Sequence, residues 1–154
     1  SWKEEHFGEE YHVVRKGCTP AFPGQKSFVG SHMLGTSVIL EGLDTEENKE
    51  GLYSTVHGAG RVMSRRQAKG KTKWKNMPDG TRQRVVVNKG EIDYDEVKKR
   101  AEQKGVVLRG GAADEAPGAY KSLEEVLEHH KDSVRVVERL HPIGVAMEGP
   151  DLHR

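Results

Sequence analysis

Short hydrophobic runs separated by polar and glycine-rich stretches make up most of this chain. Ser37-Val38-Ile39-Leu40 lies between glycines, which is typical of a buried strand. The hydrophobic positions in 134–140 fit either a last strand or a short helix. The turn-forming residues of 16–24 predict a loop, and the charged stretch 46–50 predicts a solvated surface segment. Residues with strand propensity also predict strands over 10–15, 52–56, 82–87 and 106–108.

Helix start signals complete this pattern. Asp93 is followed three residues later by Glu96, which forms a capping box, and the helix that it opens ends at Gly105 after about ten residues. A second capping box predicts a helix over 122–131. Composition favours a third helix over 61–68. Helices and strands alternate without a regular β-α-β period, so we expect an α+β fold with mixed sheet layers and flanking helices.

Composition and charge exclude several classes of protein. The 154 residues are the length of about one domain, and 34% hydrophobic residues with 18 glycines predict a loop-rich core. The net charge of +1 does not by itself point to nucleic acid or to a membrane. One cysteine excludes an internal disulfide and a CxxC zinc site. No run approaches the roughly 20 apolar residues of a membrane span and no signal peptide is visible, so we expect a cytoplasmic protein without a membrane partner.

The turn His57-Gly58-Ala59-Gly60-Arg61 carries the strongest chemical signal. Its glycines let a ligand approach the backbone, and a helix starting near Arg61 would point its free N–H groups at an anion there. On such a helix Arg61 and Arg65 share one face, which suits phosphate binding. His57 would be a nucleophile or general base, since neutral imidazole is abundant near pH 7. A strand-to-helix turn with a structural histidine explains the same spacing, and spacing alone favours it.

Three other segments each allow two interpretations. The stretch 16–24 is either a basic binding loop or a connection stiffened by proline. Tyr120 either stacks on a base or packs at the edge of the core. Lysines in 69–75 surround Trp74, which is typical of a nucleic-acid contact or of a solvated hairpin. None of the 8 histidines stands in a metal-binding pattern such as HExxH, so no metal ligands are predicted in this chain.

Four blocks in order resemble the C-terminal part of the RtcB family of RNA-splicing ligases. They are Glu4-Glu5-His6, 15–24, 57–65 and Glu115-Ala116-Pro117-Gly118-Ala119-Tyr120-Lys121. The segment 142–146 is also similar to the final strand of the family. The chain opens at Ser1 within a charged and aromatic run, which predicts a piece of a longer protein. We therefore expect residues 1–154 to be the C-terminal part of an RtcB-like catalytic domain.

The resemblance implies a specific reaction. Members of the family join an RNA 3′-phosphate or 2′,3′-cyclic phosphate to a 5′-hydroxyl, with GTP and Mn²⁺. His57 would attack the α-phosphate of GTP and carry GMP to the RNA end. The partners implied are RNA ends, either tRNA halves or broken RNA, and a helper protein of the archease type. The alternatives are a noncatalytic nucleotide- or RNA-binding relative, or a structural domain in which Arg61 and Arg65 pair with carboxylates.

The resemblance also implies roles for individual residues. It directs Lys16, Arg61 and Arg65 toward the phosphates of RNA or pyrophosphate, and it places Tyr120 on the guanine. The metal ligands of the family lie upstream of Ser1, so this chain alone is expected to be inactive. The implied contacts of GMP are Gly30, Ser31, His32, Met33, Ser37, His57, Gly58, Ala59, Gly60, Tyr120 and Met147.

Two segments of the chain depart from the family pattern. The nucleotide loop Gly-Ser-Met-Gly of the family corresponds here to 30–35, where His32 replaces a serine and Leu34 replaces a glycine. Many members end in a lysine and a glycine that read the guanine, whereas here Met147-Glu148-Gly149 continues to Arg154. These replacements are expected to alter nucleotide binding and base recognition.

Overall fold

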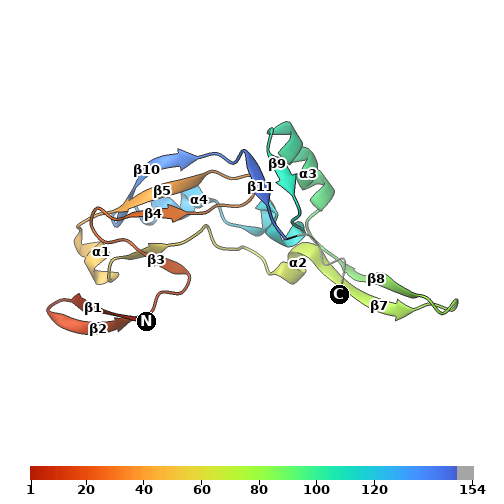
Figure 1. The fold of residues 1–154 in the computed structure, drawn as a ribbon, viewed down its shortest axis with the longest axis horizontal. Helices are drawn as coiled ribbons and strands as arrows, with labels where there is room; N and C mark the ends of the chain where they lie inside the picture. The colour runs from red at the N-terminus through yellow and green to blue at the C-terminus, as the bar shows by residue number, and fades with distance from the viewer. Residues whose placement is uncertain (149–154) are drawn as a thin grey trace. The chain divides into compact units, whose positions relative to one another are not determined.

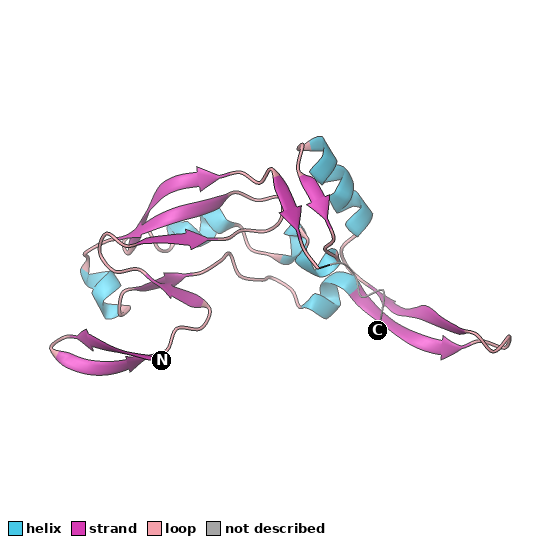
Figure 2. Ribbon diagram, viewed as in Figure 1, coloured by secondary structure: helices cyan, strands magenta, loops and turns pink. Residues whose placement is uncertain are grey.

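The computed structural model describes residues 1–148, and within them the chain divides into two compact units. Unit 1 comprises Ser1–Ser31, Gly35–Gly60 and Lys121–His141. Unit 2 comprises His32–Leu34, Arg61–Tyr120 and the segment that begins at Pro142. Both units combine short strands with short helices (Figures 1 and 2), which confirms the predicted α+β class.

Unit 1 is built around a three-stranded antiparallel sheet in the order β10-β5-β4. Two further antiparallel pairs, β1 with β2 and β3 with β6, belong to the same unit. Its elements are β1 (Trp2–His6), β2 (Glu9–Val13), β3 (Cys18–Pro20), β4 (Lys26–Val29), β5 (Ser37–Gly42), α1 (Glu46–Glu50), β6 (Ser54–Val56), α4 (Leu123–Glu128) and β10 (Val134–Leu140).

The core of unit 1 follows from strand alternation. In β5 every second residue is buried, so Val38 and Leu40 lie on the inner face of the sheet. Leu123 and Leu127 are four residues apart in α4 and therefore lie on one face of that helix, in the same buried cluster. Burying side chains of this size contributes about 2 kcal/mol each. This packing holds the ends of β5 and β6, where several predicted site residues lie.

Unit 2 contains an antiparallel hairpin, β7 with β8, and a parallel pair, β9 with β11. Val97 and Ala101 lie on one face of α3 and share a buried cluster with Met33, Leu34 and other residues. Its elements are α2 (Arg65–Lys69), β7 (Gly70–Asn76), β8 (Arg82–Lys89), α3 (Tyr94–Gln103), β9 (Val107–Arg109), the 3₁₀ turns η1 (Ala113–Glu115) and η2 (Pro117–Ala119), and β11 (Gly144–Ala146).

Most of the predicted elements are confirmed. The buried strand over 37–40 is β5, and 134–140 forms a strand rather than a helix. Asp93 caps α3, since its carboxylate accepts hydrogen bonds from the N–H groups of Asp95 and Glu96. Gly105 follows the end of α3 with φ of 69°, as expected of a helix-terminating glycine.

Four predictions about local structure are wrong in part. The stretch 46–50 is helix α1 rather than a plain solvated segment, because Thr45 caps it and Asn48 is buried. The Asn48 amide donates to the carbonyls of Ala21 and Leu43, which no sequence pattern announces. The predicted loop 16–24 contains strand β3, which pairs with β6. The helix predicted over 122–131 ends at Glu128, and the helix predicted over 61–68 begins only at Arg65.

Candidate functional site

His57 follows the last residue of β6 directly, and its side chain is exposed. The antiparallel pairing of Cys18 with Val56 brings the loop before β3 beside this histidine. A side chain at Gly17 would place its Cβ atom 4.0 Å from Nε2 of His57. Lys16, the next residue back, is exposed. The imidazole therefore lies at the surface of unit 1, next to a basic loop and outside the hydrophobic core.

The glycines after His57 have two different structural reasons. Gly58 and Gly30 form an isolated parallel bridge, and a Cβ atom on Gly58 would lie 3.4 Å from the carbonyl oxygen of Gly30. Gly60 has φ of 74°, which L side chains rarely adopt. Ala59 between them is buried in the core of unit 1. Ala59 thus anchors the turn in the core, and the two glycines leave the backbone next to His57 without side chains.

The bridge between Gly30 and Gly58 brings part of the predicted GMP site to the His57 turn. Ser31 follows Gly30, and its backbone N–H donates a hydrogen bond to Oγ of Ser37 at 3.2 Å. The hydroxyl hydrogen of Ser37 remains available to a ligand, since a hydroxyl can donate while it accepts. The predicted site residues that lie in unit 1 are Lys16, Gly30, Ser31, Ser37, His57, Gly58, Ala59 and Gly60.

The remaining predicted GMP contacts, His32, Met33, Tyr120 and Met147, belong to unit 2. Met33 is 5% exposed and lies in the hydrophobic core, with Met147 packed against the same cluster. His32 is partly buried, and its Nδ1 accepts a hydrogen bond from the N–H of Leu34 at 3.3 Å. Burial, followed by the nearby positive charges of Lys104 and Arg100, lowers the pKa of His32. In this unit Met33 and Met147 therefore act as core residues.

Arg61 is held by groups of its own unit. Its Nε donates to the carbonyl of Met63, one terminal nitrogen donates to the Tyr120 hydroxyl, and the other donates to the carbonyl of Asp114 at 2.6 Å. Its guanidinium carbon lies 4.8 Å from the centroid of the Tyr120 ring. The Tyr120 hydroxyl in turn donates to Glu115. Arg61 therefore fixes the loop that carries Tyr120.

Arg65 is more open. Its side chain is 63% exposed, and one nitrogen contacts the carboxylates of Asp114 and Glu115. The Arg65 and Lys69 cations lower the pKa of Asp114 against the opposing effect of its burial. Arg61 lies 3.9 Å from Glu115 as well, so both arginines converge on the same acidic pair. This pairing with carboxylates is the arrangement expected of a structural role.

The predicted helix N-terminus at the His57 turn is wrong. After Gly60, Arg61 forms an isolated bridge with Tyr120, the chain bends at Val62 and Met63, and α2 starts only at Arg65. Ser64 and Gln67 form a reciprocal capping box, which sets the helix start and satisfies two of its N–H groups. Arg61 lies before this helix, so it shares no helical face with Arg65. Their proximity comes from Glu115 instead.

A buried polar cluster in unit 1 was not predicted. Arg15 donates to both carboxylate oxygens of Glu4, and Nε2 of His6 lies 2.8 Å from the same carboxylate. These hydrogen bonds, above all those from Arg15, lower the pKa of Glu4 to about 2. Phe22 stacks on His6 with ring centroids 6.2 Å apart. The available signal was the spacing of Glu4 and His6, because residues two apart in a strand share a face.

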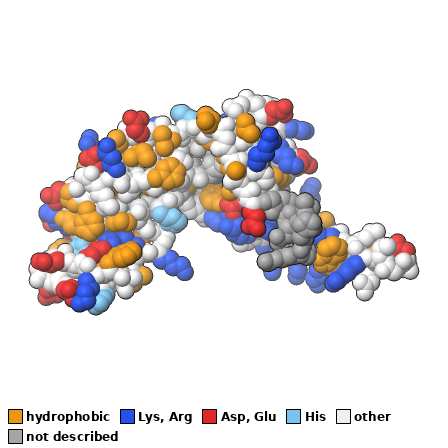
Figure 3. Space-filling model, viewed as in Figure 1, with side chains coloured by type: hydrophobic (Ala, Val, Ile, Leu, Met, Phe, Trp, Pro, Cys, Tyr) orange, Lys and Arg blue, Asp and Glu red, His pale blue; other side chains and the backbone are white. Residues whose placement is uncertain are grey.

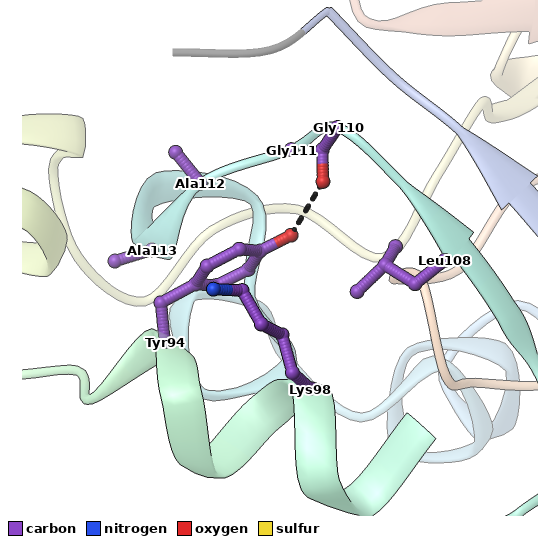
Figure 4. A pocket seen from close by; sticks show the side chains of 7 residues that line it. All are labelled: Tyr94, Lys98, Leu108, Gly110, Gly111, Ala112 and Ala113. Carbon is purple, nitrogen blue, oxygen red and sulfur yellow. Dashed lines mark hydrogen bonds between the residues drawn. The ribbon is translucent and has the colours of Figure 1, made fainter. Parts of the chain in front are cut away.

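A cavity of about 430 Å³ lies in unit 2, and none of the residues that line it is among those that the sequence predicts for the site (Figure 4). The Tyr94 hydroxyl donates to the carbonyl of Gly110 at 2.8 Å, and the Lys98 ammonium lies 5.4 Å from the Tyr94 ring centroid. A side chain on Gly111 would come within 2.5 Å of the Tyr94 hydroxyl. The cavity therefore depends on Gly111, and its lining is largely apolar.

Among residues 1–148, no group of three or more histidine, cysteine, aspartate or glutamate side chains could hold a metal ion. None of the helices in this part of the chain has the length and apolar character needed to cross a membrane.

Comparison with known proteins completes the description of the site. The family model described as tRNA-splicing ligase RtcB matches residues 1–148. The RNA-splicing ligase RtcB of Escherichia coli is 37% identical over 92% of this chain and 29% of its own length. The tRNA-splicing ligases RtcB of Thermococcus kodakarensis and Archaeoglobus fulgidus are 32% and 36% identical, over 93% and 87% of this chain and 30% and 27% of their own lengths. The chain spans less than a third of these relatives, and the match over nearly all of it shows that it belongs to the RtcB family.

Proposed function

We propose that this chain forms part of an RNA ligase that joins an RNA 3′-phosphate or 2′,3′-cyclic phosphate to a 5′-hydroxyl. The observation that carries the proposal is the exposed His57 at the end of β6, beside Gly17 and the bare backbone of Gly58. The printed names of the relatives, RNA-splicing and tRNA-splicing ligase, support the reaction class. An exposed imidazole in a glycine turn suits attack on a large phosphorylated ligand.

The proposed reaction has three steps. A nitrogen lone pair of His57 attacks the α-phosphorus of GTP, and the bond to the β-phosphate oxygen breaks, so pyrophosphate leaves. An oxygen of the RNA 3′-phosphate then attacks the same phosphorus, and the phosphorus–nitrogen bond breaks. Finally, the 5′-hydroxyl attacks the RNA phosphate and GMP leaves. A 2′,3′-cyclic end must first be opened by water to the 3′-phosphate.

Other residues of this chain would bind and orient the ligands. Ser37 would donate its free hydroxyl hydrogen to GMP, alongside the backbone of Gly30 and Ser31. Lys16 would attract phosphates, since its ammonium is exposed. Arg65 would contribute in the same way from its exposed position, and Tyr120 would stack on the guanine. Arg61 would act chiefly by holding Tyr120, because each of its three guanidinium nitrogens already donates a hydrogen bond.

The metal, the helper protein, the RNA substrates and the cellular location are proposed from the family resemblance. Residues 1–148 contain no group of ligands that fits manganese, so no step of the proposed reaction uses a metal bound by these residues. Manganese would be bound by residues outside residues 1–154 and would neutralise charge on the triphosphate. An archease-type helper protein, RNA ends as substrates and a cytoplasmic location belong to the same proposal.

The test is intact mass spectrometry of the complete natural protein that contains these residues. With GTP and Mn²⁺ we expect the mass of one GMP to be added, in a bond that is labile to acid. His57→Ala should abolish the adduct, whereas His12→Ala, which changes another exposed histidine of unit 1, should retain it. An adduct that persists in His57→Ala would place the nucleophile elsewhere. Absence of any adduct from a wild-type protein that still binds RNA would favour the noncatalytic alternative.

A further inference from the structure

The β7–β8 hairpin is strongly basic, unlike the chain as a whole. Residues 70–89 hold six lysines and arginines and one aspartate, a charge of +5, whereas the whole chain carries +1. Figure 3 shows Lys and Arg side chains along this hairpin. Among the residues that the structure describes, none of the six forms an ion pair. The six cations are Lys71, Lys73, Lys75, Arg82, Arg84 and Lys89.

The single acid of the hairpin does not offset these charges. Asp79 lies in the turn, where its Oδ1 accepts hydrogen bonds from the N–H of Thr81 at 2.9 Å and from the Thr81 hydroxyl at 2.6 Å. These hydrogen bonds lower the pKa of Asp79. The carboxylate shapes the turn, and the cations along both strands remain open to a polyanion.

One face of the hairpin combines an aromatic ring with guanidinium groups. Trp74 is paired directly with Arg84, and residues opposite each other share a face of the sheet. Arg82, diagonal to Trp74, lies with its guanidinium carbon 5.7 Å from the ring centroid. Trp74 is 48% exposed. An exposed indole between two arginines is a surface on which a nucleobase can stack while its phosphates are bound.

The opposite face carries further cations. Lys73 and Lys75 alternate with Trp74 along β7, so their side chains leave the strand on the other side. At the base of the hairpin a cavity of about 270 Å³ is lined by Arg66, Lys71 and Lys89, with Glu91 also present. The positive charge therefore continues from the turn to α2, over a strand of 7 residues.

The hairpin is also poorly covered by its own unit. Val86 and Val87 are 68% and 46% exposed, and a two-stranded ribbon buries too little to be more than marginally stable. Its base is anchored where the N–H of Ile92 donates to the carbonyl of Ala68 in α2. A bound partner would cover the exposed strands, and their charge requires that partner to be anionic.

We propose that the β7–β8 hairpin binds single-stranded RNA, with the cations holding its phosphates and Trp74 stacking on an unpaired base. A single strand is favoured over a duplex, because a base inside a duplex is already stacked and cannot reach the indole. The combination of +5 charge with an exposed indole between arginines favours nucleic acid over an acidic protein. Binding here does not depend on His57 or on GTP, so it goes beyond the proposed ligation chemistry.

The experiment measures fluorescence anisotropy of a short labelled oligoadenylate against the complete natural protein, without GTP, over a series of salt concentrations. Lys73→Gln/Lys75→Gln/Arg84→Gln should weaken binding at least tenfold and lower the salt dependence of log K by about 2, because three phosphate contacts are lost. The matched control Lys26→Gln/Lys99→Gln/Arg100→Gln removes the same charge from exposed positions outside the hairpin. Equal weakening in both triple variants would overturn the proposal.

A second pair of variants tests stacking. Trp74→Ala should weaken binding about tenfold, and Trp74→Phe should restore most of it, since the aromatic face is kept. Unchanged binding in Trp74→Ala, tighter binding of an RNA duplex, or equal binding of polyglutamate would each overturn the proposal. Circular dichroism and His57 adduct formation check that the variants fold. A wild type that binds RNA but forms no adduct separates failure of the ligation proposal from failure of this one.

Discussion

Gly17 and His57 lie side by side, although 40 positions separate them in the chain: a Cβ atom at residue 17 would be 4.0 Å from Nε2 of His57. Gly17 has φ of 77°, which favours glycine, whereas an added Cβ atom at 4.0 Å would make only an ordinary van der Waals contact with the imidazole. The strand pair β3–β6 creates this contact, since Cys18 is paired with Val56. A loop far away in sequence therefore borders His57 with its backbone alone.

Gly17→Ala should reduce adduct formation on His57 by more than its effect on stability explains. A left-handed backbone costs a non-glycine residue about 1 kcal/mol, and the new methyl group also meets the imidazole. Gly24→Ala is the matched control, because Gly24 has φ of 75° with nothing within 4 Å of an added Cβ. Adduct rates from mass spectrometry and midpoints of urea unfolding are compared for both. Equal loss of adduct in the two variants would mean that only backbone strain matters.

Ser37→Ala should weaken GTP binding roughly fivefold, corresponding to about 1 kcal/mol for one hydrogen bond. The variant leaves the Ser31 N–H without its partner at the mouth of the loop. Ser27→Ala on the neighbouring strand loses a hydroxyl that donates to the Pro20 carbonyl at 2.9 Å, and it serves as the control. Isothermal titration of both variants with GTP gives the comparison. If Ser27→Ala weakens GTP binding as much as Ser37→Ala does, the weaker binding comes from a disturbed sheet and not from a lost contact with GTP.

Glu4→Gln should lower the free energy of unfolding by about 3 kcal/mol at pH 7, because Arg15 would remain buried without its carboxylate. The folded-state pKa of Glu4 is lowered from 4.5 to about 2, so the carboxylate stabilises the fold above pH 4.5. That contribution is lost progressively as the pH falls from 4.5 toward 2. Urea unfolding at several pH values should therefore show the difference between wild type and variant shrinking in acid.

The control for this prediction is another glutamate of the same hairpin. Glu10 pairs with Lys3 at 2.7 Å, but both side chains are about 60% exposed. Glu10→Gln should cost less than about 1 kcal/mol, since water screens an exposed ion pair. A Glu4→Gln variant as stable as Glu10→Gln at pH 7 would contradict the buried cluster.

Arg61→Lys should lower stability by about 2 kcal/mol, since an ammonium cannot reach three acceptors held in different directions. The acceptors are the carbonyls of Met63 and Asp114 and the hydroxyl of Tyr120. Arg65→Lys, at a 63% exposed side chain, should change stability little. Thermal unfolding monitored by circular dichroism measures both. If Arg61→Lys unfolds like wild type but loses RNA binding, Arg61 acts on phosphates rather than on the loop.

Local signals in the sequence were sufficient to predict many of the helices and strands. The alternating burial of β5 and the Asp93 cap of α3 depend on residues next to each other in the chain. The His57 turn is also local, since its glycines were expected to keep the backbone bare. The start of α2 has a local signal as well, since Ser64 is followed three residues later by Gln67 in a capping box, but composition alone predicted a helix from Arg61.

Other features depend on contacts between distant segments. Asn48 lies in a charged stretch and is buried because the carbonyls of Ala21 and Leu43 require a donor. Met33, a predicted contact of GMP, packs in a core with α3. Such environments are set by which segments meet, and a lone sequence does not record this.

The α+β class, most strands and caps and the basic character of 70–89 follow from residue order and local periodicity, and the resemblance to RtcB ligases follows from short motifs in the right order. Three contacts could be found only in the folded chain: Gly17 borders His57, Arg61 and Arg65 both meet Glu115, and Glu4 forms a buried pair with Arg15. Each of these contacts joins residues distant along the chain, so it exists only after the sheets and hairpins have formed.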